Sequence, residues 1–100
     1  MQNENLIPAA LCCQQYNVEL SFIQSLDQYG FLHVVSVNSM QFIEMDELQT
    51  LEKFIRMHYE LDINMQGIEA INFLLERVQN MQHEIAYLKS KLNVYEKKAL

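Results

Sequence analysis

The stretch from Asn64 to the end of the chain contains no proline, and its only glycine is Gly67. Asn64 is a favourable helix N-cap, so the pattern predicts one uninterrupted helix of about thirty residues. At ~1.5 Å per residue this helix spans roughly 45–50 Å, which is longer than a small domain requires. It constrains the fold more than any other segment, because the residues before it must supply most of the globular core.

An apolar stripe follows this helix in steps of three and four residues, with one extra three-residue step near Met81. Its members are Ile68, Ile71, Leu75, Val78, Met81, Ile85, Leu88, Leu92 and Tyr95. We interpret the extra step as a division of the helix into two parts. The first part is expected to pack on the preceding helices, and the second to form a coiled-coil arm that makes a homodimer. The predicted dimerisation residues are Met81, Ile85, Leu88, Leu92 and Tyr95.

Two short helices separated by a tight turn are predicted before residue 30. The first begins near Pro8, whose fixed φ and missing N–H suit a first helical turn, and ends at about Tyr16. Asn17 tolerates the left-handed conformation of a tight turn. The second helix runs from about Glu19 to Tyr29, and Gly30 is its C-terminal cap. Such a pair is a helix–turn–helix; the inward-facing residues are predicted to be Ile7, Leu11, Cys12, Phe22, Ile23 and Leu26.

A β-hairpin is predicted next, because Phe31 to Val37 is short and rich in aromatic and β-branched residues. Asn38-Ser39 forms its turn, and Met40 to Ile43 returns. A third helix is expected from Met45 to about Leu61, and its predicted apolar face consists of Leu48, Leu51, Phe54, Ile55 and His58. The expected fold is mainly α: a winged helix–turn–helix over residues 1–63 and a long C-terminal helix over residues 64–100, forming one structural unit.

The first half of the chain contains no lysine or arginine before Lys53. It carries seven acidic residues up to that point: Glu4, Glu19, Asp27, Glu44, Asp46, Glu47 and Glu52. DNA affinity depends largely on Lys and Arg side chains that neutralise phosphates, so a reading surface without them should be repelled by a duplex. The expected partner is therefore a basic protein surface, and DNA binding is not expected.

The predicted partner-binding residues are Glu19, Asp27, Tyr29, Glu44, Asp46 and Glu47. Each has a simpler interpretation that stays open. The acidic residues could form a solvated face, and those from Glu44 to Glu47 could only favour the start of a helix. Tyr29, like Tyr16, could belong to the core rather than anchor an interface.

The sequence offers little chemistry for an enzyme or a cofactor. Its three histidines lie in different predicted elements without metal-ligand spacing, and two glycines cannot build a phosphate-binding loop. Cys12 and Cys13 are adjacent, so we expect free, buried thiols in a reducing cytoplasm. The methionines could serve as an adaptable partner surface, but we expect them to fill the core. Residues Met1 to Asn5 lack the basic start of a signal peptide, and no apolar run is long enough to cross a membrane.

The segment from Arg56 to Ile68 carries a recognisable junction. It contains Arg56, the Glu60-Leu61 pair, the aliphatic Ile63, the capping Asn64 and the Gly67-Ile68 pair that opens the long helix. It resembles the junction between the third and fourth helices of the chaperone modulatory protein family (CbpM-like), small relatives of MerR-like winged helix–turn–helix proteins. The resemblance extends forward to Leu92 and more loosely backward to Asn17.

The resemblance implies a non-enzymatic modulator that binds the J-domain of a DnaJ- or CbpA-type co-chaperone and hinders its handover to Hsp70. J-domains engage Hsp70 through a basic helix face, which an acidic binder would complement. Two other hypotheses stay open: a MerR-like transcription regulator that binds DNA, and a small subunit of a larger complex. The chain departs from MerR regulators in lacking basic residues on the reading helix and wing.

Overall fold

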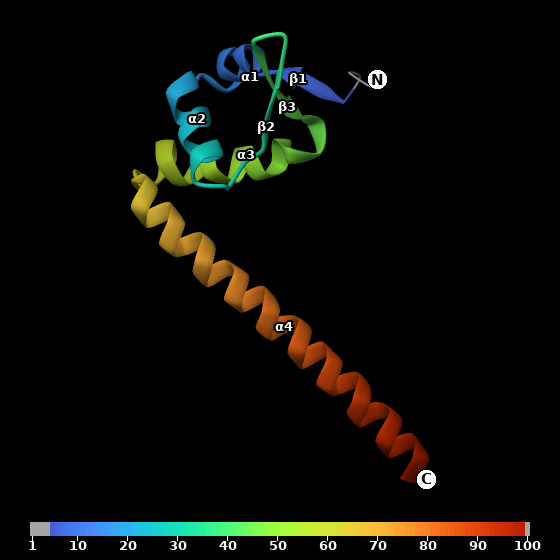
Figure 1. Ribbon diagram of the computed structural model, residues 1–100. Helices are drawn as coiled ribbons and strands as arrows, with labels where there is room; N and C mark the ends of the chain where they lie inside the picture. Colours follow the sequence, from blue (N-terminus) through green and yellow to red (C-terminus); the bar gives the residue numbers. More distant parts are fainter. Residues whose placement is uncertain (1–4, 100) are drawn as a thin grey trace. The chain divides into compact units, whose positions relative to one another are not determined.

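The computed structural model describes residues 5–99, and the chain divides into two compact units, one ending at Ile68 and the other beginning at Glu69. Glu4, one of the seven acidic residues, lies outside the described residues, as do the first four residues of the segment that we expected not to be a signal peptide. The elements of the first unit are β1 (Leu6–Pro8), α1 (Ala9–Tyr16), α2 (Leu20–Gln28), β2 (Val34–Val37), β3 (Met40–Glu44), the 3₁₀ turn η1 (Met45–Glu47), α3 (Leu48–Ile55) and the π-helical turn η2 (Arg56–Glu60) (Figure 1).

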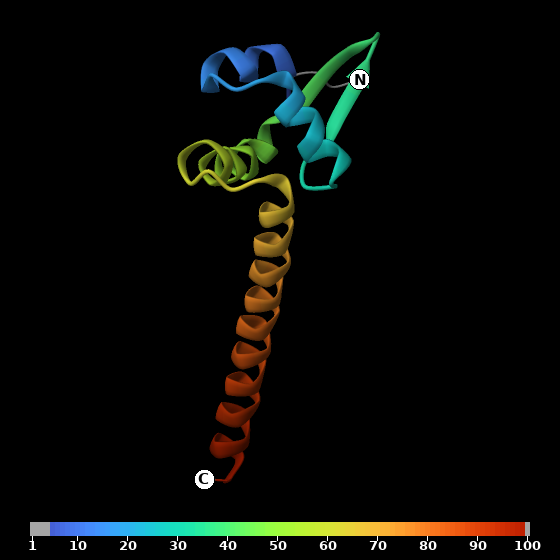
Figure 2. The same cartoon turned by 90° about the vertical axis from the view of Figure 1, so that its left-hand side faces the viewer.

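The strands form a three-stranded antiparallel sheet in the order β1-β3-β2. The β2–β3 hairpin was predicted, and Figure 2 shows its two strands running side by side to a sharp tip. Asn38 and Ser39 have φ angles of 52° and 68°, which give a turn that matches the twist of the strands. Strand β1 was not predicted; it pairs Ile7 with Ile43, so the sheet has one more strand than the sequence indicated.

The α1–α2 pair has the expected helix–turn–helix connection. Asn17 ends α1 in the left-handed conformation with a φ of 57°. At the end of α2, Gly30 has a φ of 78°, and the N–H groups of Gly30 and Phe31 donate to the carbonyls of Asp27 and Leu26. These two hydrogen bonds form a Schellman cap. The cap places its residue at position 30 in the left-handed conformation, which glycine adopts without steric cost because it has no Cβ.

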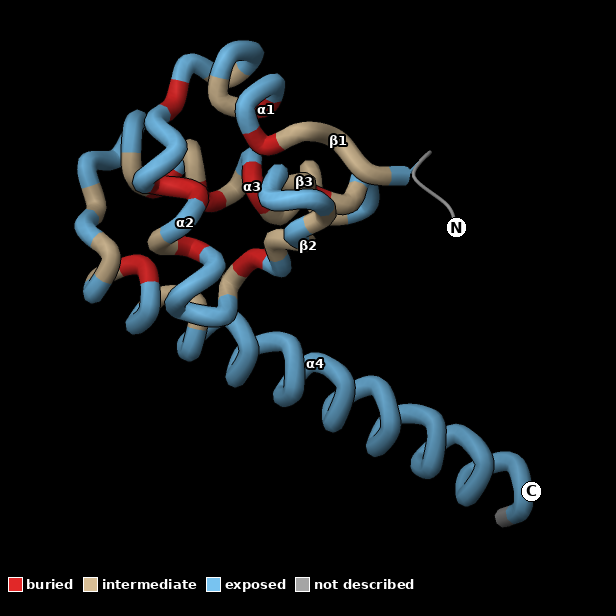
Figure 3. Tube along the Cα trace, turned by 45° about the horizontal axis from the view of Figure 1, so that its top comes forward, coloured by how far each residue is buried: buried red, intermediate tan, exposed pale blue. Residues whose placement is uncertain are grey.

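The core lies within the first unit, where the buried segments of Figure 3 gather. Its largest fully buried side chains are Ile23, Leu26, Ile43, Leu51, Phe54 and Ile68. The predicted inward residues of α2 are all buried, but Leu11 of α1 is 43% exposed, so its prediction was wrong. Ala9 and Cys12, three residues apart, occupy the buried side of α1 instead, which places Leu11 on another face of the helix.

The third predicted helix is divided rather than continuous, because it begins with the 3₁₀ turn η1 and ends with the π-helical turn η2. In η2 the His58 ring stacks on Phe22 at 4.8 Å between centroids, and its Nδ1 lies 2.9 Å from the carbonyl oxygen of Ile63. Tyr59 meets the same Phe22 edge-on at 5.3 Å. The wider π turn thus coincides with the position where two consecutive ring side chains pack on α2.

Helix α4 (Met65–Ala99) begins as predicted, because the Asn64 side chain caps it by accepting the Gly67 N–H at 2.8 Å. A Cβ at Gly67 would lie 2.7 Å from Cγ2 of Ile63, so the close approach of these residues requires glycine. Among residues 5–99, no helix is both long enough and apolar enough to cross a membrane.

The predicted packing of the first part of α4 is correct only at its start. Ile68 is buried and Ile71 half-buried, but Leu75 and Val78 are exposed. The reason is that the compact first unit ends at Ile68, so the helical turns that follow do not belong to its core.

Candidate protein-binding surface

Two of the predicted acidic residues lie together where β3 passes into η1. Glu44 ends β3 opposite Leu6 of β1, and Asp46 follows in η1. With Asn5, Leu6 and Met45 they line a cavity of about 560 Å³. The Met45 N–H donates to the Asn5 carbonyl at 2.8 Å, which fixes the backbone of this corner. We call Glu44, Met45 and Asp46 the acidic edge.

Two other predicted partner-binding residues already bind backbone groups of their own chain. Asp27 of α2 accepts the N–H of Val34 at 3.2 Å, and Glu47 of η1 accepts the N–H of His33 at 3.0 Å. The two carboxylates therefore satisfy consecutive N–H groups where the chain enters β2. They hold the base of the hairpin, whatever else they bind.

Glu19 has different neighbours from those four residues. It is exposed directly before α2, and its Oε1 accepts the Ser21 hydroxyl at 3.3 Å. Its backbone N–H donates to the hydroxyl of Tyr59, also at 3.3 Å. The start of α2 is thus connected to the π turn η2. The six predicted site residues are therefore spread over several places on the first unit and do not form one patch.

The two tyrosines that we weighed as anchors differ in their surroundings. Tyr29 is 36% exposed, with its ring centroid 5.6 Å from that of Phe31, which stacks in turn on Phe54. Tyr16 is half-buried and donates its hydroxyl hydrogen to Glu52 at 2.7 Å. This hydrogen bond raises the pKa of Tyr16 to about 12, because the phenolate would face a carboxylate.

Both thiols are free, but the prediction that both are buried holds only for Cys12, because Cys13 is half-buried. Burial raises the pKa of both Cys12 and Cys13. A higher pKa leaves less thiolate, so neither sulfur is activated as a nucleophile or ligand. Within residues 5–99, no three His, Cys, Asp or Glu side chains gather in a way that could hold a metal ion.

The expectation that the methionines fill the core was wrong in part: Met57 is buried, but Met40, Met45 and Met81 are exposed.

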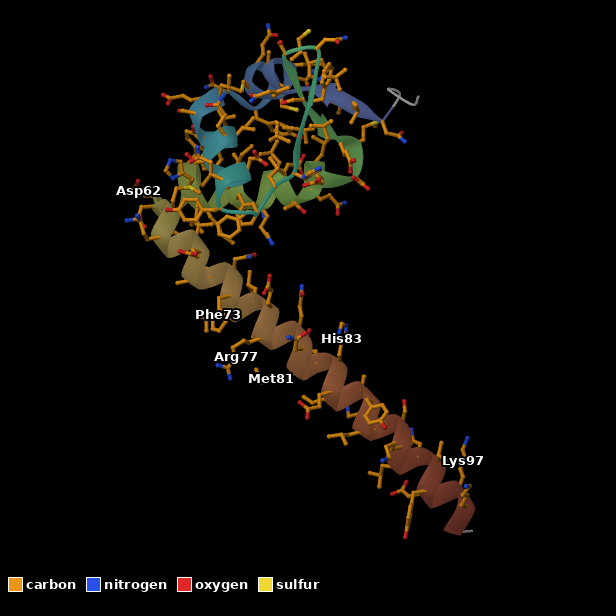
Figure 4. The ribbon with its side chains drawn as sticks, in the orientation of Figure 1. Asp62, Phe73, Arg77, Met81, His83 and Lys97 are labelled. Atoms are coloured by element: carbon orange, nitrogen blue, oxygen red, sulfur yellow. The ribbon has the colours of Figure 1, made fainter. Side chains whose placement is uncertain are left out.

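The predicted dimerisation residues Met81, Ile85, Leu88, Leu92 and Tyr95 are all exposed on α4 in the single chain. Figure 4 shows Phe73, Arg77 and Met81 along one side of this helix and His83 on another. The sequence prediction missed Leu74, which is 56% exposed against 38% for Leu75. With Leu74 in place of Leu75, the alternation of three and four residues runs unbroken from Ile71 to Tyr95, and the extra step disappears.

This unbroken apolar row consists of Ile71, Leu74, Val78, Met81, Ile85, Leu88, Leu92 and Tyr95. Its period is seven residues with two apolar positions, which is the pattern of a coiled-coil seam. Because Leu74 and Leu75 are adjacent, the local sequence does not show which of them belongs to the row. The regular spacing over the full helix identifies Leu74. The whole row lies in the second unit, which begins at Glu69.

Charge is divided unevenly along the chain. Residues 1–68 contain nine acidic and two basic side chains, a net charge of −7, whereas residues 69–100 contain four acidic and five basic side chains, a net charge of +1. The net negative charge of the protein therefore belongs to residues 1–68, which we call the winged unit. A unit with this charge attracts cationic surfaces and repels phosphate backbones.

Comparison with known proteins gives two matches. A family model described as MerR HTH family regulatory protein matches residues 7–90. The chaperone modulatory protein CbpM of Pseudomonas entomophila (strain L48) is 25% identical over 81 residues, which cover 80% of this chain and 80% of that protein. No solved structure matches significantly.

Proposed function

This chain belongs to the family of MerR HTH regulatory proteins, and we propose that it uses the winged unit to bind a protein rather than DNA. The partner that we propose is the J-domain of a DnaJ- or CbpA-type co-chaperone, whose stimulation of Hsp70 the chain would modulate without being an enzyme. The similarity to a chaperone modulatory protein supports this class of partner. The proposed place of action is the cytoplasm.

The observation that carries the proposal is the absence of lysine and arginine from the first 52 residues, which hold seven acidic side chains. These residues include α2 and the hairpin, the elements with which a winged helix–turn–helix would read DNA. Non-specific DNA affinity comes almost entirely from cations placed near phosphates. A basic helix face, by contrast, gains both attraction and orientation from such a surface.

We propose further that two copies associate through the apolar row of α4. Eight regularly spaced apolar side chains, seven of them exposed in the single chain, are costly to leave in water. Their heptad spacing suits a partner helix with the same pattern, which a second copy supplies.

The alternative is a transcription regulator, and the family match is the observation that favours it. Calorimetric titration of the full chain with a J-domain from the same organism, at two salt concentrations, tests the proposal directly. We expect salt-dependent binding of the J-domain and no change in fluorescence anisotropy of a mixed-sequence DNA duplex. A salt-dependent DNA complex near micromolar concentration, without J-domain binding, would establish the alternative.

Charge reversals locate the contact on the winged unit. Glu19→Lys and Asp46→Lys should slow association with the J-domain and weaken its dependence on salt, because rim charges act mainly on the on-rate. Glu76→Lys on α4 makes the same change in net charge outside this unit and serves as the matched control. Asp27→Lys and Glu47→Lys are less informative, since each also removes an acceptor from the base of the hairpin.

A further inference from the structure

A second concave surface lies on the winged unit, and the residues that line it are uncharged. It is a groove of about 480 Å³ between the start of α1, the start of α2 and the hairpin. Its lining includes Ala10, Leu20, Gln24, Ser36, Met40 and Gln41, and none of its lining residues is acidic or basic. We call it the neutral groove.

The neutral groove presents two large apolar side chains to solvent. Leu20, the first residue of α2, is 42% exposed, and Met40, the first residue of β3, is 57% exposed. Between these two elements, Gln24 donates its side-chain N–H to the Oε1 of Gln41 at 3.4 Å. The groove therefore joins the reading helix to the wing through a polar contact and exposes apolar groups on both.

The hairpin and helix α2, which border the groove, are each held in place by local backbone structure. The hairpin turn at Asn38-Ser39 lies directly before Met40, and it is closed by two residues with positive φ. Helix α2 is closed by the cap at Gly30 and packs through Phe22, Ile23 and Leu26. A preformed site binds with less loss of conformational entropy than a mobile one.

We propose that the neutral groove receives the central apolar side chain of an amphipathic helix of the J-domain, whose flanking Lys and Arg side chains face carboxylates of the winged unit such as Glu19. This assignment rests on the proposed function and deepens it. Leu20 and Met40 would make the desolvated centre of the contact, and Glu19, adjacent to Leu20, would belong to its charged rim. The net charge of −7 on this unit supplies the complementarity to a basic helix.

The division into a neutral centre and an acidic rim follows from the energetics of interfaces. Most binding energy comes from a few large side chains in well-packed, desolvated positions, while rim charges contribute little affinity. A carboxylate at the centre would have to lose its hydration, and this desolvation often costs more free energy than an ion pair with the partner returns. Neutral side chains in the groove avoid that cost.

The test compares exposed apolar side chains inside and outside the groove on the same unit. Leu20→Ser and Met40→Ser are introduced singly in the full chain. Leu11→Ser on α1 is the matched control, because Leu11 is 43% exposed and does not line the groove. We expect each groove variant to weaken J-domain binding about tenfold or more with an unchanged salt dependence, and Leu11→Ser to bind within about twofold of wild type. All three side chains are exposed, so the folds should remain intact, as circular dichroism will check.

Methyl NMR of the unmodified protein gives an independent measurement. Adding the J-domain should shift or broaden the ε-methyl signal of Met40 and leave that of Met81, on α4, unchanged. If wild type binds the J-domain but both groove variants bind equally well, the groove assignment is wrong and the proposed function stands. If wild type does not bind the J-domain at all, the proposed function itself fails. A loss of self-association in Leu20→Ser would instead assign the groove to a second copy and overturn the proposal.

Discussion

The two units of this chain differ in where their apolar side chains go. In the unit that ends at Ile68, six large apolar side chains are almost completely removed from water within a single chain. In the unit that begins at Glu69, no residue through Lys98 is buried, although apolar residues recur at heptad spacing. The first unit can therefore gain stability from its own core, whereas the apolar side chains of the second stay exposed in the single chain.

The units also differ in net charge, and this difference follows the same boundary as the difference in burial. The winged unit has a net charge of −7, which opposes self-association of that unit, while the α4 unit has a net charge of +1. The proposed self-association and the proposed partner binding would thus belong to different parts of the chain. Four changes test this separation, beginning with the one of largest expected effect.

Leu88→Asp combined with Leu92→Asp should convert a dimer into a folded monomer. In a homodimer this change introduces four carboxylates into the seam, each replacing a leucine whose loss alone costs about 2–5 kcal/mol. Sedimentation at micromolar concentration should show the monomer mass with the helical signal of the winged unit retained. The control is Tyr87→Asp with Val94→Asp, which changes two equally exposed apolar residues outside the row. Equal masses for both double variants would contradict the assigned seam.

Phe54→Ala should unfold the winged unit or bring it close to unfolding. Phe54 is 1% exposed and stacks on Phe31, and truncation of a buried phenylalanine costs about 3–5 kcal/mol. That loss is comparable with the total stability of many small domains. Thermal unfolding followed by near-ultraviolet circular dichroism measures it. Phe73→Ala on α4, where the side chain is 58% exposed, should change the transition by less than about 0.5 kcal/mol.

Asn64→Ala should lower stability by about 1 kcal/mol, because it removes the side-chain acceptor for the Gly67 N–H at the start of α4. The cap belongs to the winged unit, so the loss should appear in the transition of that unit and leave the dimer mass unchanged. Asn64→Asp keeps an acceptor at the same position and should restore most of the stability. A dimer that dissociates in Asn64→Ala would show that the two units are not separable.

Tyr16→Phe should have the smallest effect, about 0.5–1.5 kcal/mol, through the lost hydrogen bond to Glu52. The pKa of Tyr16 is raised in the folded state to about 12, from an ordinary value of 10.0. Its protonated form is therefore favoured by folding, so the contribution is complete below pH 10 and is lost as pH rises towards 12. Stability measured against pH should fall less steeply in this range for Tyr16→Phe than for wild type. Identical slopes would show that the bond to Glu52 does not persist in solution.

Local signals in the sequence were sufficient for most of the fold. Asn17, Gly30, Asn38-Ser39 and Asn64 each require or favour a particular backbone conformation, and the structure places all of them as predicted. The family resemblance, based on the segment from Arg56 to Ile68, was confirmed by the match to MerR HTH regulatory proteins over residues 7–90.

The features that escaped prediction depend on contacts between distant segments. Strand β1 has three residues, ends in a proline and exists only because β3 pairs with it. The π turn η2 coincides with ring stacking on Phe22, which no local spacing indicates. The surface shows the same limit: the acidic residues could be counted, but the bonds of Asp27 and Glu47 to backbone N–H groups depend on how the hairpin docks.

The pairing of β1 with β3 also has a consequence for the order of folding. Ile7 and Ile43 are partners although thirty-six positions separate them, whereas the hairpin strands meet across a two-residue turn. Closing the longer loop costs more entropy and must await the helices between its ends. The strand that leaves the ribosome first is thus expected to join the sheet last, so β3 keeps an open edge during synthesis until the helix–turn–helix has formed.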